Sequence, residues 1–123
     1  MGAARIAGTL GLDNLIMFYD ANDIQLSTET NVVMNEDTAA KYRALQWEVI
    51  EIDGNDVEQI SAAIAEAYTV KGQPTCLILN TVKGKGATFA EPSGAHSSQP
   101  TKEQWEEAIA ASEAQLAAIR AEQ

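Results

Sequence analysis

The chain is poor in cysteine, in histidine and in basic residues. Cys76 and His96 are the only representatives of their types among 123 residues, so a disulfide framework is excluded. Eight Lys and Arg against eighteen Asp and Glu give a net charge of −10, which repels nucleic-acid phosphates and anionic lipid. No apolar run reaches the roughly 18 residues that span a bilayer. We therefore predict a cytoplasmic protein that binds neither nucleic acid nor membrane.

Three short apolar runs predict β-strands. They are LIMFY (15–19), WEVIEI (47–52) and TCLILNTV (75–82). The first and third are apolar on successive residues, as expected of strands whose two faces are both covered by helices. The second alternates between apolar and polar residues, which predicts a place nearer the sheet edge. Cys76 falls in the third run and is expected to be a buried thiol.

Capping patterns predict helices between and after these strands. They are Asn35 with Glu36 and Asp37, Asn55 with Glu58, and Thr101 with Gln104. Strands that alternate with helices predict the α/β class, a parallel sheet flanked by helices. Three strands are few for such a sheet, and its edges need a covering or a partner. The chain therefore reads as part of a larger domain.

Two segments are candidates for function. Residues 20–24, DANDI, follow the first predicted strand, and ligands of parallel sheets bind beyond the carboxyl ends of the strands. The amide oxygen of Asn22 and the main-chain carbonyl of Ile24 are the kind of ligand that Mg²⁺ prefers. An ordinary Asx turn explains the same residues, and the segment alone leaves both readings open. The second candidate is the long loop 84–100, rich in Gly, Ser and Pro.

The order and spacing of four motifs resemble a known family. AGTLGLDNLIMFYDANDIQLS, WEVIEIDGNDVEQISAAI, QPTCLILNTVKGKG and a late histidine before proline are similar to the thiamine diphosphate-binding domain of transketolases. The nearest similarity is to the N-terminal half-protein of split transketolases, over about residues 3–110. The resemblance implies one partial domain, 1–123, corresponding to the C-terminal portion of that domain. Its fold would be incomplete, with an active-site loop at 84–100 and a terminal helix at 101–121.

The resemblance also implies site residues. Asn22 and the main chain of Ile24 match two of the family's metal ligands and would help to bind the cofactor. His96 matches a histidine that faces the reactive end of the cofactor and would be catalytic. Lys83 and Gly84 would lie near the cofactor. A solvent-exposed loop remains the alternative for His96, and a simple turn remains the alternative for residues 83–86.

The family's Gly-Asp-Gly motif does not occur in the sequence. In the family its aspartate binds the metal, and a separate pyrimidine-binding domain supplies a glutamate. The family transfers a two-carbon ketol unit between sugar phosphates in the pentose phosphate pathway, with thiamine diphosphate and Mg²⁺. We expect this chain to be inactive alone and to need a complementary subunit that carries the pyrimidine-binding domain. Asp20 and Asp23 are candidates to replace the absent aspartate.

Two other interpretations stay open at this point. The chain could be a non-catalytic fragment that forms a homo-oligomer through its open sheet edge. It could also belong to the related deoxyxylulose phosphate synthases, although the loop through His96 and Pro100 favours the split transketolases.

Overall fold

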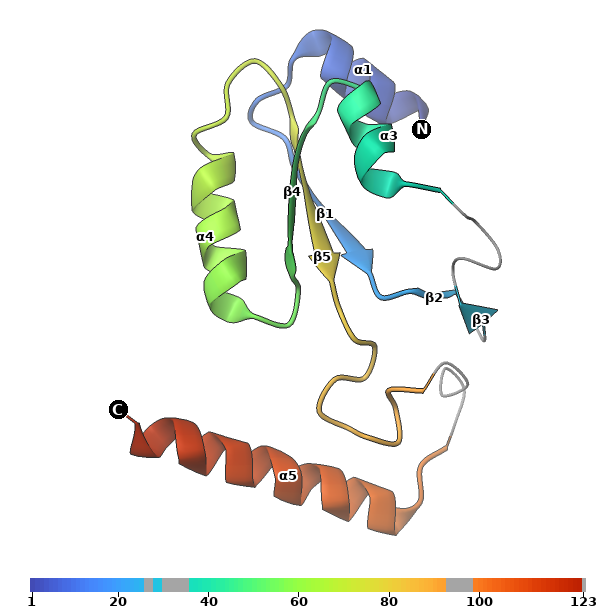
Figure 1. The fold of residues 1–123 in the computed structure, drawn as a ribbon, viewed down its shortest axis with the longest axis vertical. Coiled ribbons are helices and arrows are strands. Elements are labelled where there is room, and N and C mark those ends of the chain that lie inside the picture. The colour runs from blue at the N-terminus through green and yellow to red at the C-terminus, as the bar shows by residue number, and fades with distance from the viewer. Residues whose placement is uncertain (26–27, 30–35, 93–98, 123) are drawn as a thin grey trace.

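The computed structural model describes residues 1–25, 28–29, 36–92 and 99–122 (Figure 1). Its elements are α1 (Gly2–Leu10), β1 (Ile16–Ala21), β2 (Ile24–Gln25), β3 (Thr28–Glu29), α3 (Thr38–Ala44), β4 (Glu48–Asp53), α4 (Val57–Ala67), β5 (Thr75–Asn80) and α5 (Lys102–Ala121). None of the helices in these described ranges combines the length and the apolar character that a membrane span requires.

The main sheet has three parallel strands in the order β1-β5-β4. Its register brings Ala21, Asn80 and Asp53, the last residues of the three strands, into one row. The predicted α/β class with a parallel sheet is confirmed. The short antiparallel pair of β2 and β3 was not predicted, because neither strand is longer than two residues.

Helices cover the two faces of the sheet unequally (Figure 1). On one face, Ala63 and Ala67 of α4 form a cluster with Leu77 of β5. On the other face, α1 and α3 pack over the cluster that contains Trp47 and Cys76. Cys76 is fully buried as expected, and this burial raises the pKa of its thiol to about 11. The helices thus enclose β5 and leave β1 partly bare.

The bare part of β1 corrects one sequence prediction. We expected both faces of this strand to be covered, but Phe18 is 51% exposed. The reason is topological, since in the described part of the chain β1 pairs only with β5 and lies at an edge of the sheet. An apolar sequence indicates that both faces of a strand tend to be buried. The element that buries a face need not lie within the same 123 residues.

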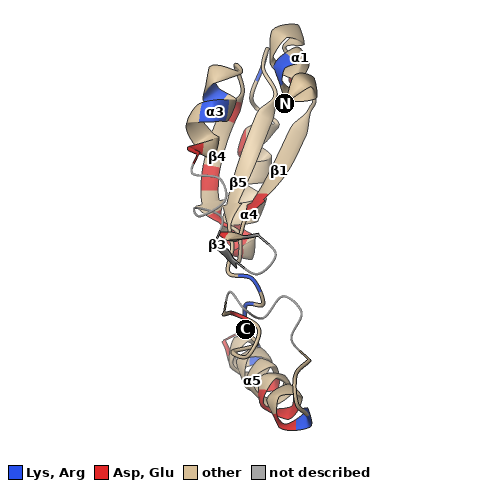
Figure 2. Cartoon of the chain, turned by 90° about the vertical axis from the view of Figure 1, so that its right-hand side faces the viewer, with Lys and Arg blue, Asp and Glu red and all other residues tan. Residues whose placement is uncertain are grey.

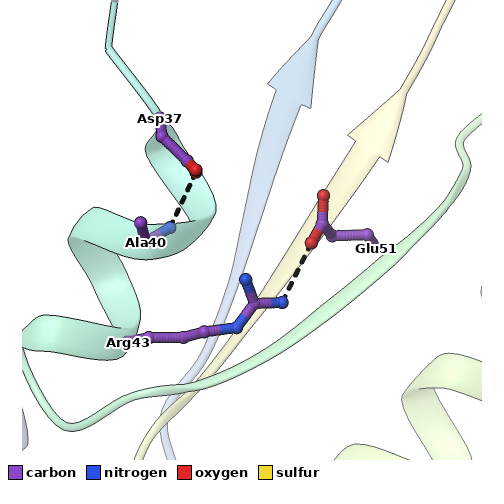
Figure 3. A network of polar contacts seen from close by, with 4 residues as sticks. All are labelled: Asp37, Ala40, Arg43 and Glu51. Atoms are coloured by element: carbon purple, nitrogen blue, oxygen red, sulfur yellow. Dashed lines mark hydrogen bonds and ion pairs between the residues drawn. The ribbon is translucent and has the colours of Figure 1, made fainter.

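The start of α3 also differs from the sequence prediction. Asp37 is the N-cap, and its Oδ1 accepts a hydrogen bond from the Ala40 amide at 2.8 Å (Figure 3). The predicted cap, Asn35, lies outside the described residues. The same helix is tied to β4 by an ion pair between Arg43 Nη2 and Glu51 Oε1 at 2.9 Å. Both partners are about half exposed, so the pair contributes little to stability but marks the side of β4 that α3 covers.

At the start of α4 the predicted cap is wrong by one residue. Asp56 caps the helix by accepting hydrogen bonds from the amides of Glu58 and Gln59. Hydrogen bonds from Gln59, more than that from Glu58, hold the pKa of Asp56 below its ordinary value. Asn55 instead accepts a hydrogen bond from the Val82 amide at 2.8 Å. A tertiary contact thus takes Asn55 away from the helix and leaves the cap to its neighbour.

The last helix, α5, stands apart from the sheet (Figure 1). It begins at the predicted capping box, in which Thr101 and Gln104 satisfy each other's backbone amides. None of its residues is buried. Trp105 is 54% exposed, and its ring packs edge-on against the ring of Phe89, with 5.4 Å between the ring centroids. The helix is therefore anchored through the loop after β5 rather than through the core.

Candidate functional site

Polar side chains gather beyond the carboxyl ends of the three parallel strands. A cavity of about 450 Å³ opens there. It is lined by Ala21 and Asp23 after β1, Asp53 and Asn55 after β4, and Asn80, Thr81, Val82 and Lys85 after β5. This edge of an open α/β sheet is where such folds bind ligands. The row of strand ends therefore supplies the floor of the candidate site.

The loop after β1 is held by its own polar side chains. The Ile24 amide donates to Asn22 Oδ1 at 3.0 Å, which closes an Asx turn. The other half of the same side chain, Asn22 Nδ2, donates to Asp20 Oδ2 at 3.0 Å. Asp20 Oδ1 accepts a further hydrogen bond from the hydroxyl of Thr81. The turn reading and the ligand reading are therefore compatible, because the turn brings Asn22 and Ile24 together.

The turn after β4 is fastened to the end of β5. The Gly54 amide donates to the Asn80 carbonyl at 2.9 Å, and the next residue, Asn55, accepts from Val82. A Cβ atom on Gly54 would lie 2.4 Å from Thr81 Cγ2, so only glycine fits this close approach. The ends of β4 and β5 consequently form one rigid wall of the cavity.

Acidic groups outnumber basic ones at the cavity. Asp23 and Asp53 line it together with Lys85, and Asp20 lies beside it. Figure 2 shows acidic positions around the strand ends, with basic positions on the segment that follows β5. A diphosphate would be repelled by the carboxylates unless a cation lay between them. Within the described part of the chain, no three His, Cys, Asp or Glu residues form a group that could hold such a cation.

The structure brings two of the predicted site residues together and leaves two others outside the cavity lining. Asn22 and Ile24 share one turn beside the cavity. Lys83 and Gly84 follow β5 but do not line the cavity, whereas Lys85 does. His96 lies outside the described residues.

Sequence reasoning missed several side chains that build the site. They are Asp53, Thr81 and Lys85, together with Asn55 in its contact to β5 and Asp20 in its contact to Thr81. The available signal was positional, because Asp53 and Thr81 are polar residues within one position of the end of a predicted strand. Parallel strands bring such residues to one edge, so the strand ends could have been compared directly.

Asp23 has a backbone φ of 56°, in the left-handed region. Aspartate tolerates this conformation, whereas a β-branched residue pays roughly 1–2 kcal/mol for it. We expect Asp23→Val to lower the free energy of unfolding, measured in urea, by about 1–2 kcal/mol. Asp23→Gly should leave this free energy unchanged or raise it slightly. Equal stability of the Val and Gly variants would contradict a left-handed Asp23.

Comparisons with known proteins find relatives of this chain among transketolases. The family model described as transketolase, thiamine diphosphate binding domain, matches residues 1–119. The 6-deoxy-6-sulfo-D-fructose transketolase subunit SqwG of Clostridium sp. strain MSTE9 is 39% identical over 110 residues, 88% of this chain and 40% of that protein. Transketolase 2 of Escherichia coli K12 is 47% identical over 83 residues, 67% of this chain and 12% of that enzyme.

Solved structures show the same relation. Transketolase of Pichia stipitis, in complex with sedoheptulose-7-phosphate, matches with a TM-score of 0.72 and 38% identity, over 76% of this chain and 14% of that one. The chain thus spans less than half the length of the relatives it matches. Because the family model covers nearly the whole chain and 76% of the chain matches a solved member in structure, the chain belongs to the transketolase family and represents part of its thiamine diphosphate-binding domain.

Proposed function

We propose that this chain supplies one wall of a transketolase-type cofactor site and works only when the rest of that site is present. The family reaction, transfer of a two-carbon ketol unit between sugar phosphates, is proposed for the complete assembly. The observation that carries the proposal is the Asx turn that brings Asn22 and Ile24 together beside a cavity at the carboxyl edge of the sheet.

The donor chemistry of this turn suits Mg²⁺. Asn22 Oδ1 uses one lone pair for the Ile24 amide and keeps a second, and a main-chain carbonyl is another hard oxygen. These two groups would hold Mg²⁺ against the cofactor's diphosphate. The cation would also offset the carboxylates of Asp23 and Asp53, which line the same cavity. When bound, thiamine diphosphate supplies the reactive carbon, whereas the residues of this chain bind and orient its diphosphate end.

Two oxygens are too few for a Mg²⁺ ion, which keeps about six ligands and releases water reluctantly. We therefore propose that the missing carboxylate and the pyrimidine-binding domain come from outside these 123 residues. Among the residues that the structure describes, no strand pairs with the outer edge of β1, and Phe18 is exposed, so a further strand has a place to add. We also propose that His96 is catalytic and lies near the reactive end of the cofactor, and that Lys83 and Gly84 lie near the cofactor at the mouth of the active site. The buried, reduced Cys76 is compatible with the cytoplasm, which is the proposed location.

The test uses calorimetry on two proteins. The first is the full 123-residue chain, titrated with thiamine diphosphate with and without Mg²⁺, with its mass measured by light scattering. The second is a chimera in which the matched segment of E. coli transketolase 2 is replaced by this chain's segment. We expect no measurable binding by the chain alone and micromolar, Mg²⁺-dependent binding by the chimera. Asn22→Ala in the chimera should weaken this binding at least tenfold, because it removes a metal ligand.

Asn14→Ala is the matched control, since Asn14 is exposed and lies at the other end of β1. It should leave the affinity unchanged. A folded chimera that binds the cofactor equally well with and without the Asn22 side chain would refute the proposed role of this turn. Tight binding by the isolated chain would show instead that Asp20 or Asp23 supplies the missing carboxylate, and Asp23→Asn would then identify which of them does so.

The second candidate function is a non-catalytic fragment that associates with copies of itself. The observation that favours it is the same bare edge of β1, because exposed edge strands pair readily with other chains. This candidate requires a stable homo-oligomer in light scattering whose mass and stability ignore thiamine diphosphate. It also requires that the chimera fail to bind the cofactor, whereas the first candidate requires that the chimera bind it.

A further inference from the structure

The carboxylate of Asp20 joins two segments of the site that are far apart in sequence. Asp20 is the penultimate residue of β1, and its Oδ1 accepts a hydrogen bond from the hydroxyl of Thr81, the first residue after β5. Its Oδ2 accepts a hydrogen bond from Asn22 Nδ2 at 3.0 Å. The Thr81 amide also donates to the Ala21 carbonyl at 3.3 Å, which holds the two strand ends side by side. The loop after β1 is thereby linked to the central strand.

These contacts fix the orientation of the Asn22 amide. Nδ2 faces a carboxylate, which only accepts hydrogen bonds, and Oδ1 faces the Ile24 amide, which only donates. A reversed amide would set oxygen against carboxylate and NH₂ against N–H, so both contacts would be lost together. The carboxylate of Asp20 and the Ile24 amide therefore together determine which way Asn22 Oδ1 points.

We propose that Asp20 and Thr81 are positioning residues that hold Asn22 Oδ1 ready for the metal. The proposal rests on the proposed function, because it needs Asn22 to be a ligand. Both carboxylate oxygens of Asp20 already accept hydrogen bonds from protein donors, so a metal at Asp20 would have to compete with the hydroxyl and the amide. Outer partners of this kind typically change metal affinity by about 10- to 100-fold when they are removed.

The test compares the cofactor binding of four variants in the chimera. Asp20→Ala removes both contacts and should weaken Mg²⁺-dependent binding of thiamine diphosphate by about tenfold or more. Asp20→Asn keeps one acceptor for Asn22, and its NH₂ can donate to the Thr81 hydroxyl, so a positioning residue should lose much less. Thr81→Val, which has the same shape but no hydroxyl, should weaken binding, and Thr81→Ser should restore it.

A second readout needs no cofactor. In the ¹⁵N-labelled chain, the side-chain NH₂ of Asn22 should show restricted motion by relaxation, and the Ile24 amide should exchange slowly with solvent. Asp20→Ala should release both groups, whereas Asp20→Asn should leave both restricted. Glu66→Ala, at an exposed position on α4, is the control that should change neither the motion nor the affinity.

Three results would overturn the positioning role. The first is an unchanged affinity in Asp20→Ala while Asn22→Ala still weakens binding, which would leave the proposed function standing. The second is loss of binding in Asp20→Asn equal to that in Asp20→Ala, which would make Asp20 a metal ligand itself. The third is an Asn22 NH₂ that moves freely in the unaltered chain. If Asn22→Ala also leaves binding unchanged, the proposed function fails, and the NMR measurement still decides whether Asp20 orients the amide.

Discussion

Gly54→Ala is expected to destabilise the chain by about 2–3 kcal/mol, although it adds only one methyl group. The added Cβ would lie 2.4 Å from Thr81 Cγ2 and 2.6 Å from Leu79 Cβ. Both atoms lie close to the backbone and cannot rotate out of the way. The turn after β4 must therefore shift away from β5. Urea denaturation followed by circular dichroism measures the loss.

Gly2→Ala is the matched control. A Cβ on Gly2 meets nothing within 4 Å, and the residue opens α1, so alanine there should be neutral or stabilising by up to about 1 kcal/mol. Hydrogen exchange of the Val82 amide gives a second measure, because its acceptor, Asn55, follows Gly54 directly. Gly54→Ala should speed this exchange. Similar stabilities of the two variants would mean that the turn is not packed against β5 as described.

The elements that sequence reasoning predicted well are those defined by local patterns. Each of the apolar runs 15–19, 47–52 and 75–82 overlaps a strand of the parallel sheet. The helix predicted from the capping pattern of Asn55 with Glu58 forms α4, and Cys76 is buried. In each case neighbouring residues carry the information, because burial on one side or both sides of an element repeats at a fixed period.

The details that were missed depend on contacts between distant residues. Asn55 and Asp56 are both good helix caps, and the choice between them follows from the Val82 amide, 27 residues along the chain from Asn55. The exposed face of β1 was missed because strand order, not composition, places it at an edge. No pattern within the run 15–19 distinguishes a central strand from an edge strand.

The candidate site divides in the same way. Asn22 and Ile24 could be proposed from one motif, because both lie in a single loop. The contact between Asp20 and Thr81 could not, since it depends on the pairing of β1 with β5. The residues of the turn after β1 are therefore predictable from local sequence, whereas the contact that orients them depends on the register of the sheet.

Leu77→Ala is expected to lower the free energy of unfolding by about 3–5 kcal/mol. Leu77 is fully buried at the centre of β5, where it packs against Ala63 and Ala67 of α4. These alanines let the helix approach the sheet closely, and their side chains are too short to fill the space that the leucine side chain would leave. Against a typical stability of about 5–15 kcal/mol, the variant would be partly unfolded at moderate urea concentrations.

The control for Leu77→Ala is Leu10→Ala on α1, where the leucine is 65% exposed and the change should stay within about 0.5 kcal/mol. A loss below about 1 kcal/mol for Leu77→Ala would contradict the described core. The site should suffer as well, because β5 is the strand that joins β1 to β4 in the described sheet. When the packing of β5 is weakened, the contacts of Thr81 with Asp20 and of Val82 with Asn55 are lost. The loop after β1 and the turn after β4 then no longer keep their positions at the cavity, although only one buried leucine has been changed.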